Sequence, residues 1–156
     1  DTMVKKASLS QILEVETDHH SLAEIFLRHQ EALVGMEFTQ ALGALEEFAR
    51  RLSRHIRIEE EHLIPVYAEL GDFIHAGKPD VFIEEHRKIE QRTKDLLSAT
   101  RSLTLGAGAR RAVILLLERE THLKEMLNHH VKREDAILFQ RLKEHLAGDG
   151  KKKAAK

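Results

Sequence analysis

The sequence predicts an all-α protein, an up-and-down antiparallel four-helix bundle, on three observations. The chain has 156 residues but only two prolines and eight glycines, so residues that break helices are few. Its apolar residues recur at alternating spacings of three and four, which is typical of helices that bury one face. Glycine-containing segments divide this pattern into four stretches, and two of the dividing segments are very short. One domain of four helices is therefore expected.

The first two stretches should form one helical hairpin. Ser8 is a candidate N-cap of the first helix, because Gln11 follows it three residues later as in a capping box. The first helix should end near Gly35 and the second should run from there to Gly71. Because the loop between them is very short, the two helices should lie antiparallel.

The other two stretches should form a second hairpin that resembles the first. The third helix follows the segment 71–79, which carries two glycines and a proline, and should end near Gly106. The fourth helix follows a short glycine-containing loop and should end before Gly148. We therefore expect the bundle domain over residues 8–147 and a solvated, lysine-rich tail over residues 148–156.

The composition argues against several classes of function. Acidic and basic residues number 26 and 25, so no strong field of one sign would attract nucleic acid. The chain has no cysteine, which leaves only nitrogen and oxygen atoms as metal ligands. No apolar run approaches the roughly 18 residues of a membrane span, and the N-terminus lacks the apolar core of a signal peptide. No membrane partner is expected, and the cytoplasm is the simplest location.

A repeated motif on the second and fourth helices carries the main functional signal. His55-x-x-x-Glu59 recurs as His130-x-x-x-Glu134, and in both copies a second acid and then an apolar pair follow. Residues four apart lie on one helix face, about 6 Å apart along the axis. Each motif can therefore offer an imidazole and a carboxylate to one centre.

Two further histidines are expected at the same level of the bundle. Counting from the short loops places His19 level with His55, and His86 level with His130. His20 competes with His19 in the sequence. We prefer His19 because it shares the apolar stripe of the first helix.

The two glutamates of the repeated motif suggest a metal site. An ionised carboxylate in a core is costly unless it is paired or binds a cation, and Glu59 and Glu134 both lie on apolar stripes. Carboxylates from facing helices, with one histidine per helix, are how helical bundles hold two metal ions. The alternative is a metal-free, hydrogen-bonded pair of histidine and glutamate in each hairpin.

Two residues near the site are weaker candidates. Glu90 lies one turn after His86 and could be an additional ligand, although such a residue is more often solvated. His62 lies one turn past Glu59 and could hydrogen-bond a ligand carboxylate or sit at the end of the bundle. His29 lies about 15 Å beyond the first-helix candidate, too far to share its metal.

This pattern resembles the hemerythrin-like, or HHE cation-binding, domains over nearly the whole chain. The resemblance implies two non-haem iron ions with a bridging oxygen species, although zinc or manganese would also suit these donors. It implies that the two glutamates bridge the ions and that the histidines are terminal ligands. The metal ligands it implies are His19, His55, Glu59, His86, His130 and Glu134.

The chain departs from the oxygen-carrying hemerythrins in two places. Those proteins have a second histidine where this chain has Glu90, and they place the last acid five residues after its histidine, whereas here both Glu134 and Asp135 follow His130. Fewer nitrogens and more carboxylates should favour ferric iron, so reversible oxygen carriage is less expected. The resemblance then implies a protein that binds, senses or reacts with oxygen, peroxide or nitric oxide. The alternatives are an iron-responsive regulatory module and an iron storage or delivery protein, and the sequence identifies neither an enzymatic activity nor a protein partner.

Overall fold

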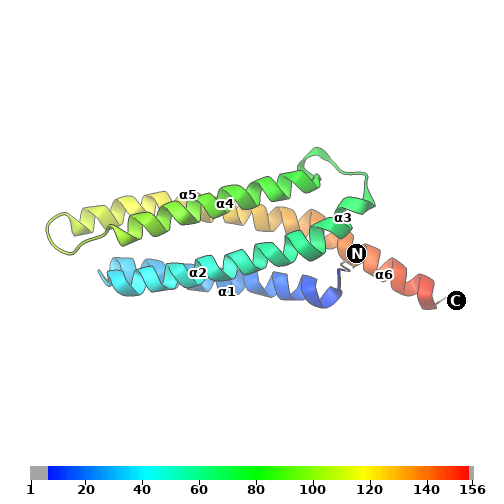
Figure 1. Cartoon of the computed structure of the whole chain (residues 1–156), viewed down its shortest axis with the longest axis horizontal. Helices are drawn as coiled ribbons and strands as arrows, with labels where there is room; N and C mark the ends of the chain where they lie inside the picture. The colour runs from blue at the N-terminus through cyan, green and yellow to red at the C-terminus, as the bar shows by residue number, and fades with distance from the viewer. Residues whose placement is uncertain (1–6, 155–156) are drawn as a thin grey trace.

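Four long helical segments lie side by side and antiparallel in the computed structural model, which describes residues 7–154 (Figure 1). The first is α1 (Leu9–Val34) and the third is α4 (Pro79–Arg101). The second is built from α2 (Phe38–Ile58), a π-helical turn η1 (Glu59–Leu63) and α3 (Ile64–Leu70). The fourth is built from α5 (Ala109–Arg133), a π-helical turn η3 (Glu134–Phe139) and α6 (Gln140–Ala154). The predicted all-α, up-and-down four-helix bundle is confirmed.

The first helix begins as its sequence predicts. The backbone N–H of Gln11 donates to Ser8 Oγ at 3.2 Å, and the N–H of Ser8 donates to Gln11 Oε1 at 3.0 Å. This capping box satisfies two N–H groups that a helix start would otherwise leave unpaired. It fixes the start of α1 and so the level of every side chain that follows.

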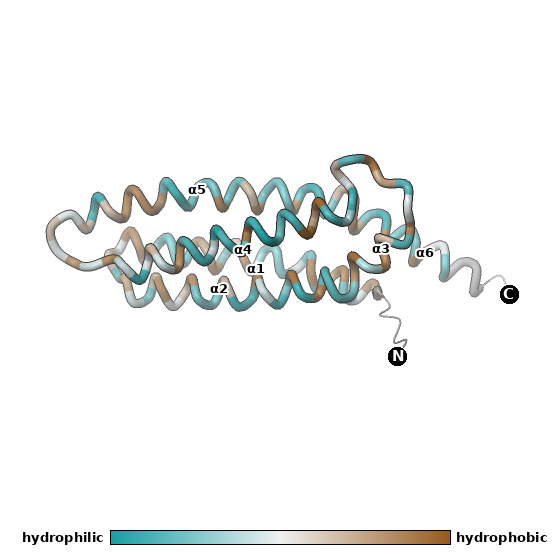
Figure 2. The backbone as a smooth tube through the Cα atoms, turned by 45° about the horizontal axis from the view of Figure 1, so that its top comes forward, coloured by the Kyte–Doolittle hydropathy of each residue, from teal (hydrophilic) through white to brown (hydrophobic). Residues whose placement is uncertain are grey.

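Two apolar clusters fill the bundle, and hydrophobic and hydrophilic residues alternate along each segment around them (Figure 2). Along the bundle, one cluster lies on one side of the histidines and the other cluster lies on the opposite side. On α1, for example, Val15 belongs to one cluster and Leu22 to the other, with His19 between them. On α4, Phe82 belongs to the same cluster as Val15, and Ile89 belongs to the same cluster as Leu22. The buried polar residues therefore form a layer across the bundle, with apolar packing on both sides.

The second and fourth segments each contain a π-helical turn that starts at the glutamate of the repeated motif. In η1 the N–H of Ile64 donates to the carbonyl of Glu59, five residues earlier. Such a turn inserts a residue into the helix and rotates everything beyond it. As a result Leu63 and Tyr67 are buried, whereas His62 is not. A uniform helical period would place His62 on the buried face, but that period does not apply across this turn.

The connection between α3 and α4 is fastened to the fourth segment. Gly71 ends α3 with φ of 68°, and its carbonyl accepts a hydrogen bond from Arg141 at 2.8 Å. The short 3-10 helix η2 (His75–Gly77) follows, and the Tyr67 hydroxyl donates to the carbonyl of Gly77. These contacts fix where α4 begins and thus which of its residues face the polar layer.

The fourth segment is longer than the sequence predicts. Helix α6 continues through Gly148 to Ala154, so the expected end before Gly148 is wrong. Glycine lowers helix propensity by about 1 kcal/mol but, unlike proline, leaves the backbone hydrogen bond in place. The expected tail at 148–156 therefore starts as a continuation of the helix, and its last residues, 155–156, lie outside the described residues. None of the described helices has the length and apolarity of a membrane span.

Candidate metal centre

The six predicted ligands lie together in the polar layer, and all four helical segments contribute. Five of them are buried, and the side chain of His19 is 12% exposed. Two pairs of imidazole rings mark the two hairpins. The ring centroids of His19 and His55 are 4.9 Å apart, and those of His86 and His130 are 4.8 Å apart. The levels counted from the short loops are therefore correct.

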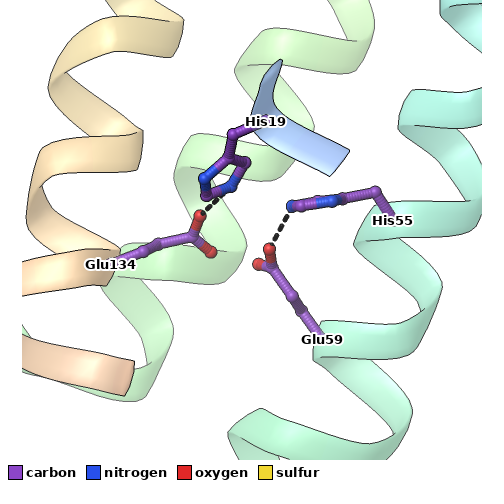
Figure 3. Close-up of side chains that lie close together, drawn as sticks. All are labelled: His19, His55, Glu59 and Glu134. Carbon is purple, nitrogen blue, oxygen red and sulfur yellow. Dashed lines mark ion pairs between the residues drawn. The ribbon is translucent and has the colours of Figure 1, made fainter. Parts of the chain in front are cut away.

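The donor atoms fall into two overlapping groups of four, within each of which all atoms lie within 4.8 Å of one another. The first group is His19, His55, Glu59 and Glu134, whose side chains face one another in Figure 3. The second group is Glu59, His86, His130 and Glu134. Each group has two imidazoles of its own, and the two groups share both carboxylates.

Glu59 reaches both groups with different oxygens. Its Oε1 lies 2.5 Å from Nε2 of His55, and its Oε2 lies 2.8 Å from Nε2 of His86. The carboxylate thus spans from its own helical segment to α4. It is oriented as a ligand that bridges two ions would be.

Glu134 repeats this arrangement from the opposite hairpin. Its Oε1 lies 3.5 Å from Nε2 of His19, and its Oε2 lies 3.2 Å from Nε2 of His130 and 3.8 Å from Nε2 of His86. The internal repeat of the sequence is therefore a repeat of geometry, with one carboxylate from each hairpin placed between the two groups.

Two carboxylates outside the centre contact the Nδ1 atoms of two of the histidines. Glu60 Oε2 lies 2.7 Å from Nδ1 of His86, and Glu85 Oε1 lies 2.9 Å from Nδ1 of His130. An Nδ1–H that donates to a carboxylate leaves the Nε2 lone pair free to bind a metal, and it also fixes the plane of the ring. Both Nε2 atoms do face the centre.

Each of these outer carboxylates is itself held by an arginine. Arg87 donates to Glu60, and Arg133 donates to Glu85. The sequence pattern predicted no role for either glutamate, although Glu60 belongs to the repeated motif. Both contacts cross between helices, so no spacing within one helix could reveal them.

Burial and charge act together on the residues of the centre. Burial alone would lower the pKa of His86, but its contacts with Glu134 and Glu59 outweigh burial and raise the pKa to about 10. Burial alone would raise the pKa of the Glu134 carboxyl, but its contacts with Glu59, His130 and His19 hold that pKa well below its usual range. The pKa of His55 is also raised, because Glu59 outweighs burial. The raised pKa values favour the protonated forms of His86 and His55, whose charges oppose those of the buried carboxylates.

Several of the atoms that could bind a metal in this centre lack a hydrogen-bond partner among the described residues. They include both carboxylate oxygens of Glu134, Oε1 of Glu59 and Nε2 of His19. Buried polar atoms are normally satisfied, and unsatisfied ones cost free energy. Four such atoms that converge from three helical segments are the atoms that a bound cation would satisfy. The residues present therefore fit a metal site.

The structure separates His19 from its neighbour in the sequence. His19 faces the centre, whereas His20 is exposed. Asp135 is likewise exposed, while Glu134 is fully buried. In both cases the residue on the apolar stripe is the one that reaches the centre.

The two weaker candidates lie outside both donor groups. Glu90 accepts a hydrogen bond from Arg87, one turn before it on the same helix. His62 has a side chain that is 32% exposed, and its Nε2 lies 4.0 Å from a carboxylate oxygen of Glu61. The π-helical turn accounts for His62, because it rotates this residue away from the buried face.

A second buried polar pair lies apart from the centre. His29 Nε2 is 2.6 Å from Oε2 of Glu120, and its Nδ1 is 2.7 Å from the carbonyl oxygen of Ala41. Because a carbonyl oxygen can only accept, Nδ1 carries a proton and donates it to Ala41. Both side chains are fully buried. His29 thus lies outside both donor groups, and the structure identifies Glu120 as the partner that the sequence did not reveal.

The comparison with known protein families agrees with this geometry. A family model described as the hemerythrin HHE cation-binding domain matches residues 11–149. No match was found among curated proteins, and none among solved structures. The family match covers most of the chain, and it includes the whole buried histidine and glutamate cluster. The chain therefore belongs to the hemerythrin HHE cation-binding domain family.

Proposed function

We propose that this protein holds two non-haem iron ions in the candidate metal centre and binds, senses or reacts with oxygen, peroxide or nitric oxide. The observation that carries the proposal is that Glu59 and Glu134 each place one oxygen in each donor group. A pair of iron ions would supply a centre that can bind a small molecule and exchange electrons with it.

The donor count supports two ions rather than one. Each group would offer one ion two imidazole nitrogens and two carboxylate oxygens, which makes four protein donors. Non-haem iron sites that bind small molecules keep positions open beyond their protein ligands. Four donors leave such positions on each ion, whereas a single ion could not use all eight donor atoms.

The surrounding residues support the centre in two ways. The outer carboxylates Glu60 and Glu85 hold the rings of His86 and His130 in the orientation that directs Nε2 inward. The apolar clusters on both sides of the layer lower the local dielectric, which strengthens the electrostatic interactions inside.

Iron is preferred over zinc or manganese on the family membership and the mixed nitrogen and oxygen donors. The test is anaerobic loading of metal-depleted protein with ferrous iron, followed by metal analysis and optical spectroscopy. We expect two iron ions per chain, and a spectrum that changes on addition of oxygen, peroxide or nitric oxide. Retention of well under one ion per chain under these conditions would contradict the proposal.

The same sample separates binding from catalysis. A spectral change that reverses when the small molecule is removed, without its consumption, supports a carrier or sensor. Rapid loss of peroxide or nitric oxide with many turnovers per chain supports an enzyme. Loading with iron but no response to any of the three molecules would instead favour storage, delivery or a regulatory module.

A further inference from the structure

A cavity of about 260 Å³ is lined by α1, α2, α4 and α5 and reaches the candidate metal centre. At its inner end it is lined by buried residues, including His55 and His86. At its outer end it is lined by exposed residues, including Leu27 and Lys124. The cavity therefore leads from the surface to the imidazole rings of both donor groups.

The cavity is larger than oxygen, peroxide or nitric oxide requires. An apolar cavity of about 150 Å³ in another protein is enough to hold benzene, with six non-hydrogen atoms. By the same proportion, 260 Å³ suits about ten non-hydrogen atoms. A diatomic molecule would fill only a small part of this space.

The walls of the cavity favour a ligand that is largely apolar. Between its two ends it is lined by aromatic and aliphatic side chains from all four helical segments, among them Phe26, Leu52, Ile89 and Leu127. Such a surface gains free energy when it is covered by hydrocarbon. A wholly polar molecule would lose its hydration there without replacement hydrogen bonds.

The outer end carries one positive charge. Lys124 is the only charged residue, apart from the histidines, among the described residues that line the cavity. Its Nζ lies 3.5 Å from Oε1 of Gln30, whose Nε2 donates to Oε1 of Glu120 at 3.2 Å. Glu120 already pairs with His29, and no carboxylate oxygen of the described residues lies within 4.0 Å of the Lys124 amine. Lys124 is therefore held beside the opening with its charge available to an anion.

We propose that this cavity binds a medium-chain carboxylic acid, with the acid group paired to Lys124 and the hydrocarbon chain extending toward His55 and His86. This places the far end of the chain beside the metal centre, so the inference deepens and rests on the proposed function by naming an organic ligand for the same site. Octanoate, with ten non-hydrogen atoms, is the probe that matches the volume.

The first test is calorimetric titration of the iron-loaded protein with butanoate, hexanoate and octanoate. Affinity should rise by about fourfold for each added methylene group while the cavity can still accept it. An affinity that does not depend on chain length would overturn the proposal, because it would mean that the acid group alone is recognised.

The second test uses variants of the opening and of the wall. Lys124→Gln should weaken octanoate by about twofold to fivefold, as expected for a partly exposed ion pair, and should leave octanol binding unchanged. Lys94→Gln is the matched control, because Lys94 is an exposed lysine of α4 that does not line the cavity. Leu127→Phe should weaken octanoate and octanol alike by filling the cavity. Equal octanoate affinity in the Lys124 variant and the wild type would overturn the assigned orientation, as when the carboxylate binds the metal instead.

Iron content and thermal melting of every variant are measured in the same samples. A protein that holds two iron ions per chain but binds no octanoate at millimolar concentration contradicts this inference and leaves the proposed function standing. A protein that binds octanoate with the expected chain-length dependence but retains no iron contradicts the proposed function, and the cavity assignment stands.

Discussion

Nε2 of His86 lies 2.8 Å from Oε2 of Glu59, across the interface between the two helical hairpins. Glu59 belongs to the first hairpin and His86 to the second, and the longest connection of the bundle separates them in the chain. The centre is therefore not a property of either hairpin alone. Its assembly requires that the two hairpins dock in register.

Removal of a shared carboxylate should release metal. Glu59→Ala or Glu134→Ala deletes one donor oxygen from each group at once, so we expect fewer than one iron ion per chain after loading and desalting. The check is metal analysis of each variant beside the wild type. Glu90→Ala is the control, because Glu90 lies outside both groups and should leave the iron content unchanged. Equal iron loss in all three variants would show that the ligands are wrongly assigned.

The outer carboxylate Glu85 should tune metal affinity without being a ligand. Glu85→Gln removes the charge that holds the Nδ1–H of His130 and should lower metal affinity by about 10-fold to 100-fold. Competition with a metal chelator measures this change. Glu84→Gln is the matched control, since Glu84 is the exposed preceding residue. The role of Glu85 would be contradicted if both variants lost metal at the same chelator concentration as the wild type.

The metal-free protein should be most stable in mildly acidic solution. The folded state raises the pKa of His86 from 6.5 to about 10, so this residue contributes stability that is complete below pH 6.5 and is lost as the pH rises toward 10. The pKa of Glu134 is held well below 4.5, so its contribution is present above pH 4.5 and is lost as the pH falls below that value. Urea unfolding of the metal-free protein should therefore show a maximum between these limits.

Bound metal should reverse the alkaline part of this dependence. A metal-binding histidine must be neutral, so binding releases protons and becomes tighter as the pH rises. The stability difference between iron-loaded and metal-free protein should accordingly grow from pH 6 to pH 8. A metal-free protein whose stability rose steadily over the same interval would contradict the assignment of the buried charges.

Gly77 should be intolerant of a side chain. A Cβ atom there would lie 3.0 Å from Cγ2 of Ile137 and 3.1 Å from the Tyr67 hydroxyl oxygen, so Gly77→Ala should destabilise the protein by about 1–3 kcal/mol. Gly43→Ala is the control, because a Cβ added at Gly43, within α2, would meet no packed neighbour within 4 Å. This second change should stabilise the protein by about 0.5–1 kcal/mol. Urea unfolding compares the two, and similar effects in both variants would mean that the connection is not fastened at Gly77.

Much of the centre could be predicted because its residues obey rules within one helix or one short loop. The spacing of four puts His55 and Glu59 on one face, and a short loop fixes the level of His19 against His55. The internal repeat then predicts the second half of the centre, His86, His130 and Glu134, by the same rules. The structure brings these residues together, and their roles as ligands remain the prediction that the experiments above test.

The features that sequence did not reveal depend on contacts or geometry outside those rules. The π-helical turns change the helical period, so Leu63 is buried where the regular pattern predicts His62. Leu13 is 50% exposed although it lies in α1 next to the buried Ile12, because an apolar residue can lie beside the buried stripe without belonging to it. Glu85 and Glu120 each contact a histidine of another helix, and such contacts depend on how the helices pack.

The central claim is that two ions share the carboxylates of Glu59 and Glu134. Diffraction from crystals of the iron-loaded protein, recorded on both sides of the iron absorption edge, tests it most directly. We expect two anomalous peaks per chain, one beside His19 and His55 and one beside His86 and His130, with an oxygen of each glutamate between them. A single peak, or two peaks that do not share these carboxylates, would contradict it.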